Sequence, residues 1–216
     1  MSGLSNESLS EALAQLRSED VRIQNRGVAA VIEIGAEAVP ALLAMLKEFS
    51  GGHRAQVMYA LSQIADPMGA DAFKRGLADE NERVRSSAAV GLLRIGDPDA
   101  LAALVQTIGD APDELHGDMT PAVFALGEMG VTALPSLLGL LMDENETTRL
   151  RAQRAVEQIL MRHHGFVPGQ GFPDATAEEQ FRVEWRANGD YRYSDDVAAR
   201  AAAVEKWHRW MTGFEE

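Results

Sequence analysis

The acidic loop between residues 110 and 118 is the densest group of side chains that could do chemistry. It contains Asp110, Asp113, Glu114, His116 and Asp118. Oxygen ligands at alternating positions can hold a hard divalent cation, but this spacing does not match a calcium-binding loop. A solvated acidic loop accounts for the same residues. We therefore expect no metal site here, and an exposed segment that could contact a partner.

Other catalytic arrangements are missing from the sequence. The chain has no cysteine, which excludes disulfides, thiolate metal sites and cysteine nucleophiles. No Ser-His-Asp arrangement, phosphate-cradling glycine loop or nucleophile elbow can be identified. His163 and His164 close a helix, where cationic side chains suit the terminal carbonyls. We expect neither catalytic residues nor a bound cofactor.

The sequence repeats with a period of about 30 residues between residues 20 and 162, and this repeat predicts the helices that carry these side chains. Each copy has a small residue, a large apolar residue and a second apolar residue one helical turn later. The aligned positions are Ala30-Val31 with Ile34, Ala60-Leu61 with Ile64, Gly91-Leu92 with Ile95, Ala125-Leu126 with Met129, and Ala155-Val156 with Ile159. Successive copies are 30, 31, 34 and 30 residues apart. Such a chain is a stack of helix pairs.

Apolar side chains at a spacing of three or four residues predict both helices of each pair. The first helices are expected at about 20–34, 53–65, 82–95, 117–129 and 146–162. The second helices are expected at about 37–48, 68–78, 98–109 and 132–142. An additional helix at about 6–17 would cap the N-terminal end of the stack.

Two kinds of joint connect the helices of a pair. Gly35 and Gly130 can end a helix in a left-handed conformation, with Pro40 and Pro135 in the first turn of the next helix. The other joints are Asp66-Pro67 and Asp97-Pro98, in which Asp can cap a helix and Pro can begin it. An acidic Asp-Glu-Asn-Glu segment opens two of the first helices, where the helix dipole favours negative charge.

The net charge of −13 limits the partners of the chain, since 33 acidic residues face 20 basic ones. Residues 101–150 hold eight carboxylates against the single Arg149. A phosphate backbone or an anionic membrane would be repelled, whereas a basic protein or peptide would be attracted. No secretory signal or membrane span is recognised, so a cytoplasmic location is expected.

The segment from Asp79 to Leu101 resembles a known repeat. Val84-Arg85, Ala88, Leu92 and Ile95-Gly96-Asp97-Pro98 are similar to the short HEAT-like repeat of the phycobilisome-lyase type. Two copies depart from the pattern, with Gln24 and Met119 in place of the repeat arginine. The resemblance implies an all-α fold, a right-handed α-solenoid of about five HEAT-like helix pairs with terminal capping helices. It also implies that the second helices line a concave, protein-binding face.

Two enzymes resemble this architecture. Bilin lyases share the repeat and usually work as a pair of subunits, but no tetrapyrrole pocket can be singled out in the sequence. Deoxyhypusine hydroxylase holds two irons through repeated His-Glu pairs. The sequence has no such pair, since His53, His116, His164 and His208 are followed by Arg, Gly, Gly and Arg. The di-iron chemistry is therefore not expected.

The C-terminal extension is rich in aromatic residues, with nine of the thirteen in the chain lying in residues 166–216. Helices are expected at 176–187 and 195–212. We expect one domain, with a solenoid over 1–165 and a capping extension over 166–216. In the alternative, Trp185, Tyr191 and Tyr193 line a binding groove, since Trp and Tyr are common anchors of interfaces.

We interpret the chain as a non-catalytic protein–protein interaction scaffold and not as an enzyme. Its concave face would bind a protein or peptide, for which a basic surface is favoured, and its oligomeric state is left open. The candidate contact residues are Asp71, Lys74, Arg75, Asp99, Gln106, Trp185, Tyr191 and Tyr193. The alternatives are a bilin-lyase-like or other chromophore-handling or ligand-handling protein, and a purely structural module of a larger assembly.

Overall fold

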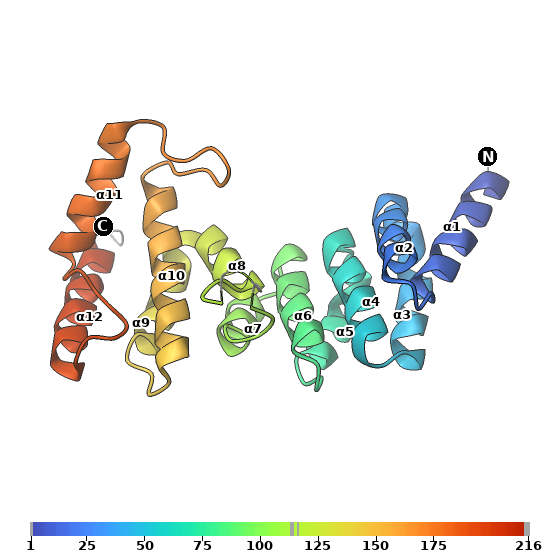
Figure 1. The fold of residues 1–216 in the computed structure, drawn as a ribbon, viewed down its shortest axis with the longest axis horizontal. Coiled ribbons are helices and arrows are strands. Elements are labelled where there is room, and N and C mark those ends of the chain that lie inside the picture. The colour runs from blue at the N-terminus through green and yellow to red at the C-terminus, as the bar shows by residue number, and fades with distance from the viewer. Residues whose placement is uncertain (1, 113–114, 116, 214–216) are drawn as a thin grey trace. The chain divides into compact units, whose positions relative to one another are not determined.

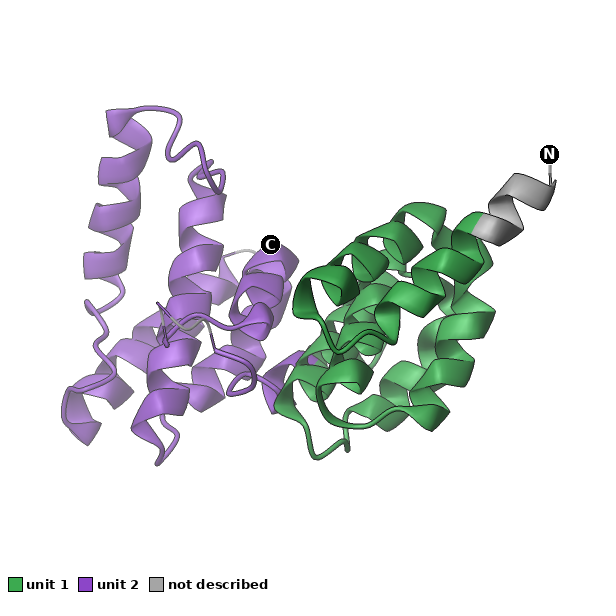
Figure 2. Cartoon of the chain, turned by 45° about the vertical axis from the view of Figure 1, so that its right-hand side comes forward, with its two compact units in different colours: residues 1–103 green, residues 104–216 purple. Residues whose placement is uncertain are grey.

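The computed structural model describes residues 2–112, 115 and 117–213, with the side chains of residues 2–7 left aside. These residues form helices joined by short turns, and one β-bridge between Val167 and Gly171 is found among them (Figure 1). The prediction of an all-α repeat fold is confirmed. The chain divides into two compact units, residues 1–103 and 104–216, shown in different colours in Figure 2.

The first unit contains the N-terminal helix and the helix pairs that follow it. Its elements are α1 (Ser2–Leu16), α2 (Val21–Ile34), η1 (Gly35–Ala38), α3 (Val39–Glu48), α4 (Gly51–Ile64), η2 (Pro67–Gly69), α5 (Ala70–Gly76) and α6 (Glu82–Arg94). Helix α4 packs on both α2 and α6, and α5 packs on α6. The first helices of successive pairs are therefore neighbours, as in a stack of repeats.

The second unit contains the later repeats and the C-terminal extension. Helix α7 (Ala100–Gln106) crosses the boundary between the units. The remaining elements are α8 (Pro121–Met129), η3 (Gly130–Ala133), α9 (Leu134–Leu140), α10 (Glu146–His163), α11 (Ala175–Ala187) and α12 (Val197–Thr212). The change of composition at 165/166 does not coincide with the unit boundary, because α11 packs on α10 and α12 packs on α9.

The aligned positions of the repeat form the cores of both units. Val31, Leu61, Leu92, Leu126 and Val156 are at most 1% exposed. Burying a large aliphatic side chain stabilises a fold by about 1.5–3 kcal/mol, so one such residue in every copy fixes the spacing of the helices.

Glycine ends the first helix of two pairs in a conformation that other residues avoid. Gly35 has φ 74° and ψ −137°, and Gly130 has φ 68° and ψ −147°. The positive φ confirms the need for glycine, but these ψ values lie outside the left-handed helical region that we expected. A short 3₁₀ turn follows each glycine and leads into the proline-containing first turn of α3 or α9.

The repeat arginine holds the acidic linker that precedes its helix. The Arg85 guanidinium donates to the carbonyl oxygens of Asp79 and Glu80 at 2.8 and 3.1 Å. Arg149 makes the same bonds to Asp143 and Glu144, both at 2.9 Å. Asparagine provides the N-cap in both copies, because the Asn81 side chain accepts from Arg83 N and the Asn145 side chain accepts from Thr147 N.

Aromatic rings pack the segments of the C-terminal extension against one another. Trp207 is fully buried and lies between Trp185 and Trp210, with ring centroids 5.4 and 5.3 Å away. The ring contacts continue from Trp185 through Phe181 to Phe172. Large rings exclude water with few residues, which suits a short extension.

Two stretches of the sequence are long and apolar enough to cross a membrane, Val21–Glu48 and Pro121–Leu140. Each of them contains a positive-φ glycine and a 3₁₀ turn, so each is a pair of helices rather than one straight span. Core helices of a repeat protein pass the same test of length and composition, so this finding is weak evidence for a membrane segment.

Candidate functional site

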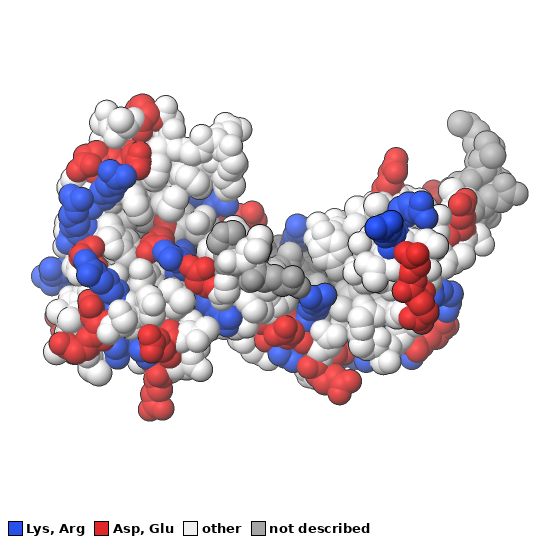
Figure 3. Space-filling view, in the orientation of Figure 1, with Lys and Arg blue, Asp and Glu red and all other residues white. Residues whose placement is uncertain are grey.

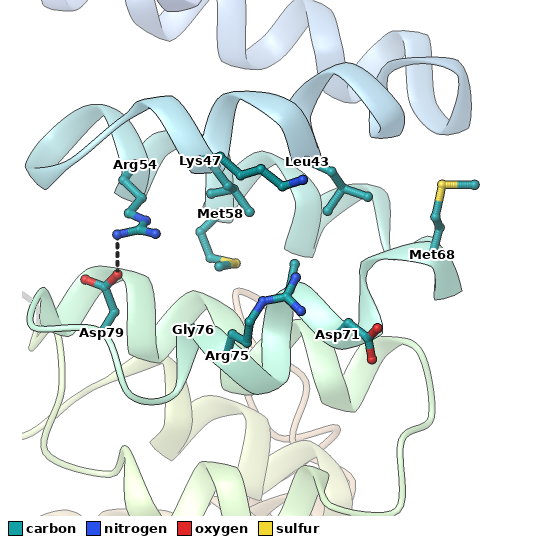
Figure 4. Close-up of a pocket in the computed structure, with 11 residues that line it drawn as sticks. Leu43, Lys47, Arg54, Met58, Met68, Asp71, Arg75, Gly76 and Asp79 are labelled. Atoms are coloured by element: carbon teal, nitrogen blue, oxygen red, sulfur yellow. Dashed lines mark ion pairs between the residues drawn. The ribbon is translucent and has the colours of Figure 1, made fainter.

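A cavity of about 460 Å³ lies between α3, α4 and α5 of the first unit (Figure 4). This volume falls within the range of about 300–1,000 Å³ that is usual for sites of small molecules. The lining residues come from α3, α4, η2 and α5 and from the segment after α5. They are Leu43, Leu46, Lys47, Arg54, Met58, Met68, Asp71, Ala72, Arg75, Gly76 and Asp79.

One wall of the cavity is apolar. Leu46, Met58 and Ala72 are 8%, 2% and 5% exposed, and Leu43 is half-buried beside them. Gly76 allows α5 to approach this wall, because a Cβ at that position would lie 2.7 Å from the Met58 Cε. Met58 is an unbranched, polarisable side chain that can adapt its shape to a flat apolar ligand.

Two cationic side chains reach into the cavity from opposite sides. Lys47 extends from α3 and Arg75 extends from α5, and both point into the space between these helices in Figure 4. Neither forms an ion pair with any residue that the structure describes. Since unpaired cations beside an apolar wall attract carboxylates, this arrangement suits an apolar molecule that carries acidic groups.

A third cation of the cavity, Arg54, is already paired. Its guanidinium nitrogen lies 3.2 Å from Asp79 Oδ2, and the Asp79 side chain is only 10% exposed. Arg54 lies in the first turn of α4, whereas Asp79 follows α5, so the pair joins two segments that line the cavity (Figure 4). This end of the cavity therefore has no net charge from the pair.

The structure places the first group of candidate contact residues on or near this cavity. Asp71 and Arg75 line it, and both are exposed. Lys74 does not line the cavity. It forms ion pairs with Asp99 at 2.8 Å and with Asp97 at 3.2 Å, so the charges of Lys74 and Asp99 are already paired. The hydrogen bond that Lys74 donates to the Asp99 carboxylate is the main reason why the pKa of Lys74 is raised. The pKa of Asp97 is lowered, chiefly because its carboxylate accepts from the Asp99 N–H.

The other candidate contact residues lie in the second unit. Gln106 is exposed at the end of α7. Trp185 is half-buried against Trp207 and Phe181. The main chain of Tyr193 is fixed, because its N–H donates to Gln153 and its carbonyl accepts from Arg149. A role of these three residues in partner binding stays a prediction.

Tyr191 has a structural position. It is 1% exposed, and its hydroxyl donates to the Leu141 carbonyl oxygen at 2.6 Å. Burial raises the pKa of Tyr191 to about 12. A side chain buried to this extent fastens the extension to the end of α9 and does not line a surface groove in the folded unit.

The acidic loop provides no metal site that the structure can describe. Asp113, Glu114 and His116 lie outside the described residues. Asp118 is held by Arg154, which also binds Glu157. Within the described part of the chain, no group of three or more His, Asp or Glu side chains is placed to hold a metal ion.

Sequence reasoning missed Lys47, Arg54, Met58 and Asp79 as residues of the site. One signal was present, because Arg54 aligns with Arg85 and Arg149 of the repeat. In the other two copies this arginine binds the carbonyl groups of an acidic linker. Ser50-Gly51-Gly52 replaces that linker before Arg54, so this arginine is free to bind elsewhere.

Comparison with known proteins identifies the repeat and one relative. A family model described as HEAT repeats matches residues 39–116, which include every residue that lines the cavity. The chain is 42% identical over 83 residues to the bilin biosynthesis protein RpcF of Synechococcus sp. (strain WH8020). The aligned segment covers 36% of this chain and 40% of that protein, so the chain spans less than half of the relative's length.

These findings confirm one prediction and overturn another. The resemblance to HEAT-like repeats of the phycobilisome-lyase type is confirmed. The interpretation of the chain as a non-catalytic scaffold for another protein is contradicted by the similarity to a bilin biosynthesis protein. That interpretation rested on the general use of α-solenoids, which does not determine the function of a particular site.

Proposed function

We propose that the chain is a bilin-handling protein with a lyase-like role, which binds a linear tetrapyrrole in the cavity of the first unit. The observation that carries the proposal is the pairing of an apolar wall, formed around Met58 and Leu46, with the unpaired cations Lys47 and Arg75. The similarity to a bilin biosynthesis protein supports it.

The chemistry of a bilin matches this arrangement. A bilin is a chain of four conjugated, largely apolar rings that carries two propionate groups. Its rings would lie against the Met58 side of the cavity, and a propionate would accept hydrogen bonds from Lys47 and Arg75. Because Lys47, Asp71 and Arg75 are exposed, the cavity opens to solvent and a bound bilin would keep one accessible edge.

The chain would hold and orient the bilin rather than bond to it covalently through sulfur. The 216 residues contain no cysteine, so a thioether to a bilin would have to form on a partner protein. A partner with a basic surface is favoured by the net charge of −13. On the face shown in Figure 3, Lys and Arg lie among Asp and Glu. A cytoplasmic location and the binding of a partner protein or peptide stay predictions.

Binding of biliverdin to the purified chain tests the proposal. We expect its long-wavelength absorption to shift on binding, because the rings leave water for an apolar wall. The double change Lys47→Gln and Arg75→Gln should weaken binding about 100-fold, because each substitution removes a charge-assisted hydrogen bond of about 1.5 kcal/mol. Arg26→Gln is the matched control, since Arg26 is an exposed cation of α2 outside the cavity.

Two results would contradict the proposal. In the first, biliverdin causes no spectral change at any concentration that keeps the protein soluble. In the second, the cavity variant and the Arg26→Gln variant lose affinity equally, which would indicate general attraction between the bilin and positive charge.

A further inference from the structure

The ion pair between Arg54 and Asp79 distinguishes one end of the cavity from the rest. The two side chains are 3.2 Å apart, and their exposed fractions differ, at 40% for Arg54 and 10% for Asp79. The arginine is therefore more accessible to a ligand than the carboxylate that neutralises it, and the pair lies at one end of the cavity (Figure 4). Among the cations of the cavity, Lys47 and Arg75 have no such partner in the described part of the chain.

The Asp79 carboxylate has two separate tasks. Its Oδ1 accepts from Asn81 N at 2.9 Å, which fixes the turn before α6. Its Oδ2 faces Arg54. The same turn exists in the second unit, where Asp143 Oδ1 accepts from Asn145 N at 2.8 Å. Since the turn forms there through Oδ1 alone, the bond between Asp79 Oδ2 and Arg54 is not needed to build it.

We propose that the Arg54–Asp79 pair is a latch that the second carboxylate of the ligand must displace. The inference rests on the proposed function, and it deepens it by assigning selectivity to Arg54 and Asp79. A ligand with one free carboxylate is satisfied by Lys47 and Arg75. A ligand with two free carboxylates, such as a bilin with both propionates free, can bind Arg54 only if the ion pair between Arg54 and Asp79 breaks.

Removal of the Asp79 carboxylate should change the affinity for a dicarboxylate in opposite directions, depending on whether Asp79 competes with the ligand or positions Arg54. If Asp79 competes with the ligand, its removal frees Arg54 and tightens the binding of a dicarboxylate. If Asp79 instead holds Arg54 in the binding geometry, its removal weakens binding. A partly exposed ion pair contributes little net energy, so we expect Asp79→Asn to tighten biliverdin binding about 2- to 5-fold.

Asp79→Asn is suited to this test because the amide oxygen can still accept from Asn81 N and preserve the turn. Asp71→Asn is the matched control. Asp71 is an exposed carboxylate of the same cavity and has no ion pair with a described residue, so the substitution removes the same charge without opening a latch. Equal thermal unfolding midpoints of both variants and the parent chain would show that the fold is intact.

Biliverdin and its dimethyl ester are the two probes, and their dissociation constants are measured by absorption. The latch predicts that Asp79→Asn binds biliverdin more tightly than Asp71→Asn does, because Asp71→Asn measures the effect of removing a carboxylate from the cavity without freeing Arg54. It also predicts that Asp79→Asn leaves the affinity for the ester unchanged. The additional substitution Arg54→Gln should abolish the gain, because the freed arginine is what the second carboxylate binds.

The outcomes distinguish this inference from the proposed function. If biliverdin binds to the parent chain but Asp79→Asn leaves its affinity unchanged, weakens it, or matches Asp71→Asn, the latch is wrong and the bilin site stands. The latch is also wrong if the ester gains as much as the acid. If neither probe binds any variant, the proposed function fails and the latch fails with it.

Discussion

The Tyr191 hydroxyl contributes to stability at the scale of a single residue. Its donor bond to Leu141 O is buried, so Tyr191→Phe leaves a carbonyl without this partner. We expect the free energy of unfolding to fall by about 1–3 kcal/mol in urea titrations followed by circular dichroism. Tyr193→Phe is the control, because the Tyr193 hydroxyl has no hydrogen bond with a described residue. An equal loss in both variants would mean that the Leu141 bond contributes nothing.

The same hydroxyl makes stability depend on alkaline pH. Burial raises the pKa of Tyr191 to about 12, above the value of about 10 for an unfolded tyrosine. The folded state therefore holds its proton more strongly, and this contribution is complete below about pH 10 and lost as the pH rises to about 12.

Unfolding at about pH 9 and pH 11 measures this dependence. The parent chain should lose on the order of 1 kcal/mol more than Tyr191→Phe between these values, since the other tyrosines are common to both proteins. Parallel losses in the two proteins would show that Tyr191 does not titrate differently on folding.

At the scale of helices, Gly91 lets α6 lie close to α5. A Cβ at this position would come within 2.5 Å of the Phe73 ring, and Phe73 is fully buried. Gly91→Ala should therefore destabilise the chain by about 1–3 kcal/mol in thermal or urea unfolding. Gly52→Ala in α4 has open space around its new methyl group and should change stability by less than about 0.5 kcal/mol.

A second substitution checks that the ring is the cause. Phe73→Leu makes room beside position 91, so Gly91→Ala should cost less in that background than in the parent chain. If Gly91→Ala lowers the free energy of unfolding equally in both backgrounds, the Phe73 ring is not the reason why position 91 needs glycine.

The helices of this chain follow closely from its sequence, because their signals are local. The apolar spacing predicts the ends of α2, α4, α6 and α10 to within two residues. The region before α8 was the exception. A helix was expected from residue 117, but α8 begins at Pro121 after the N-cap Thr120, so the longer spacing of that copy lies in the preceding loop.

The cavity was harder to foresee, because it depends on side chains that are distant in sequence. Lys47 and Arg75 belong to different helix pairs, and only packing brings them to one space. The polar residues proposed from the second helices as partner contacts include Asp71 and Arg75, which line the cavity, and Lys74, which faces Asp97 and Asp99. Their role in partner binding stays a prediction. Neighbours on a helix point in directions about 100° apart, so one of them can face a cavity and the other a salt bridge.

At the scale of the whole molecule, the two compact units allow the binding site to be located without a structure of a complex. Biliverdin should slow amide hydrogen exchange in residues 39–79 of the first unit and leave residues 104–213 unchanged. Mass spectrometry of peptides after exchange in deuterated water would measure this. Protection of α10 and α11 instead of α3 to α5 would indicate a site in the second unit and contradict binding of the bilin in the cavity of the first unit.

Asp79 belongs both to a turn of the repeat and to the cavity. Asp79 and Asp143 make the same bond to the asparagine two residues later, so in both copies this side chain fixes the local turn. The turn therefore places a carboxylate at the same point of both copies. The copy that begins with α4 has Ser50-Gly51-Gly52 in place of an acidic linker, and its Arg54 pairs with the turn carboxylate of the next copy. A side chain that fixes a local turn can in this way also contribute charge to a binding site.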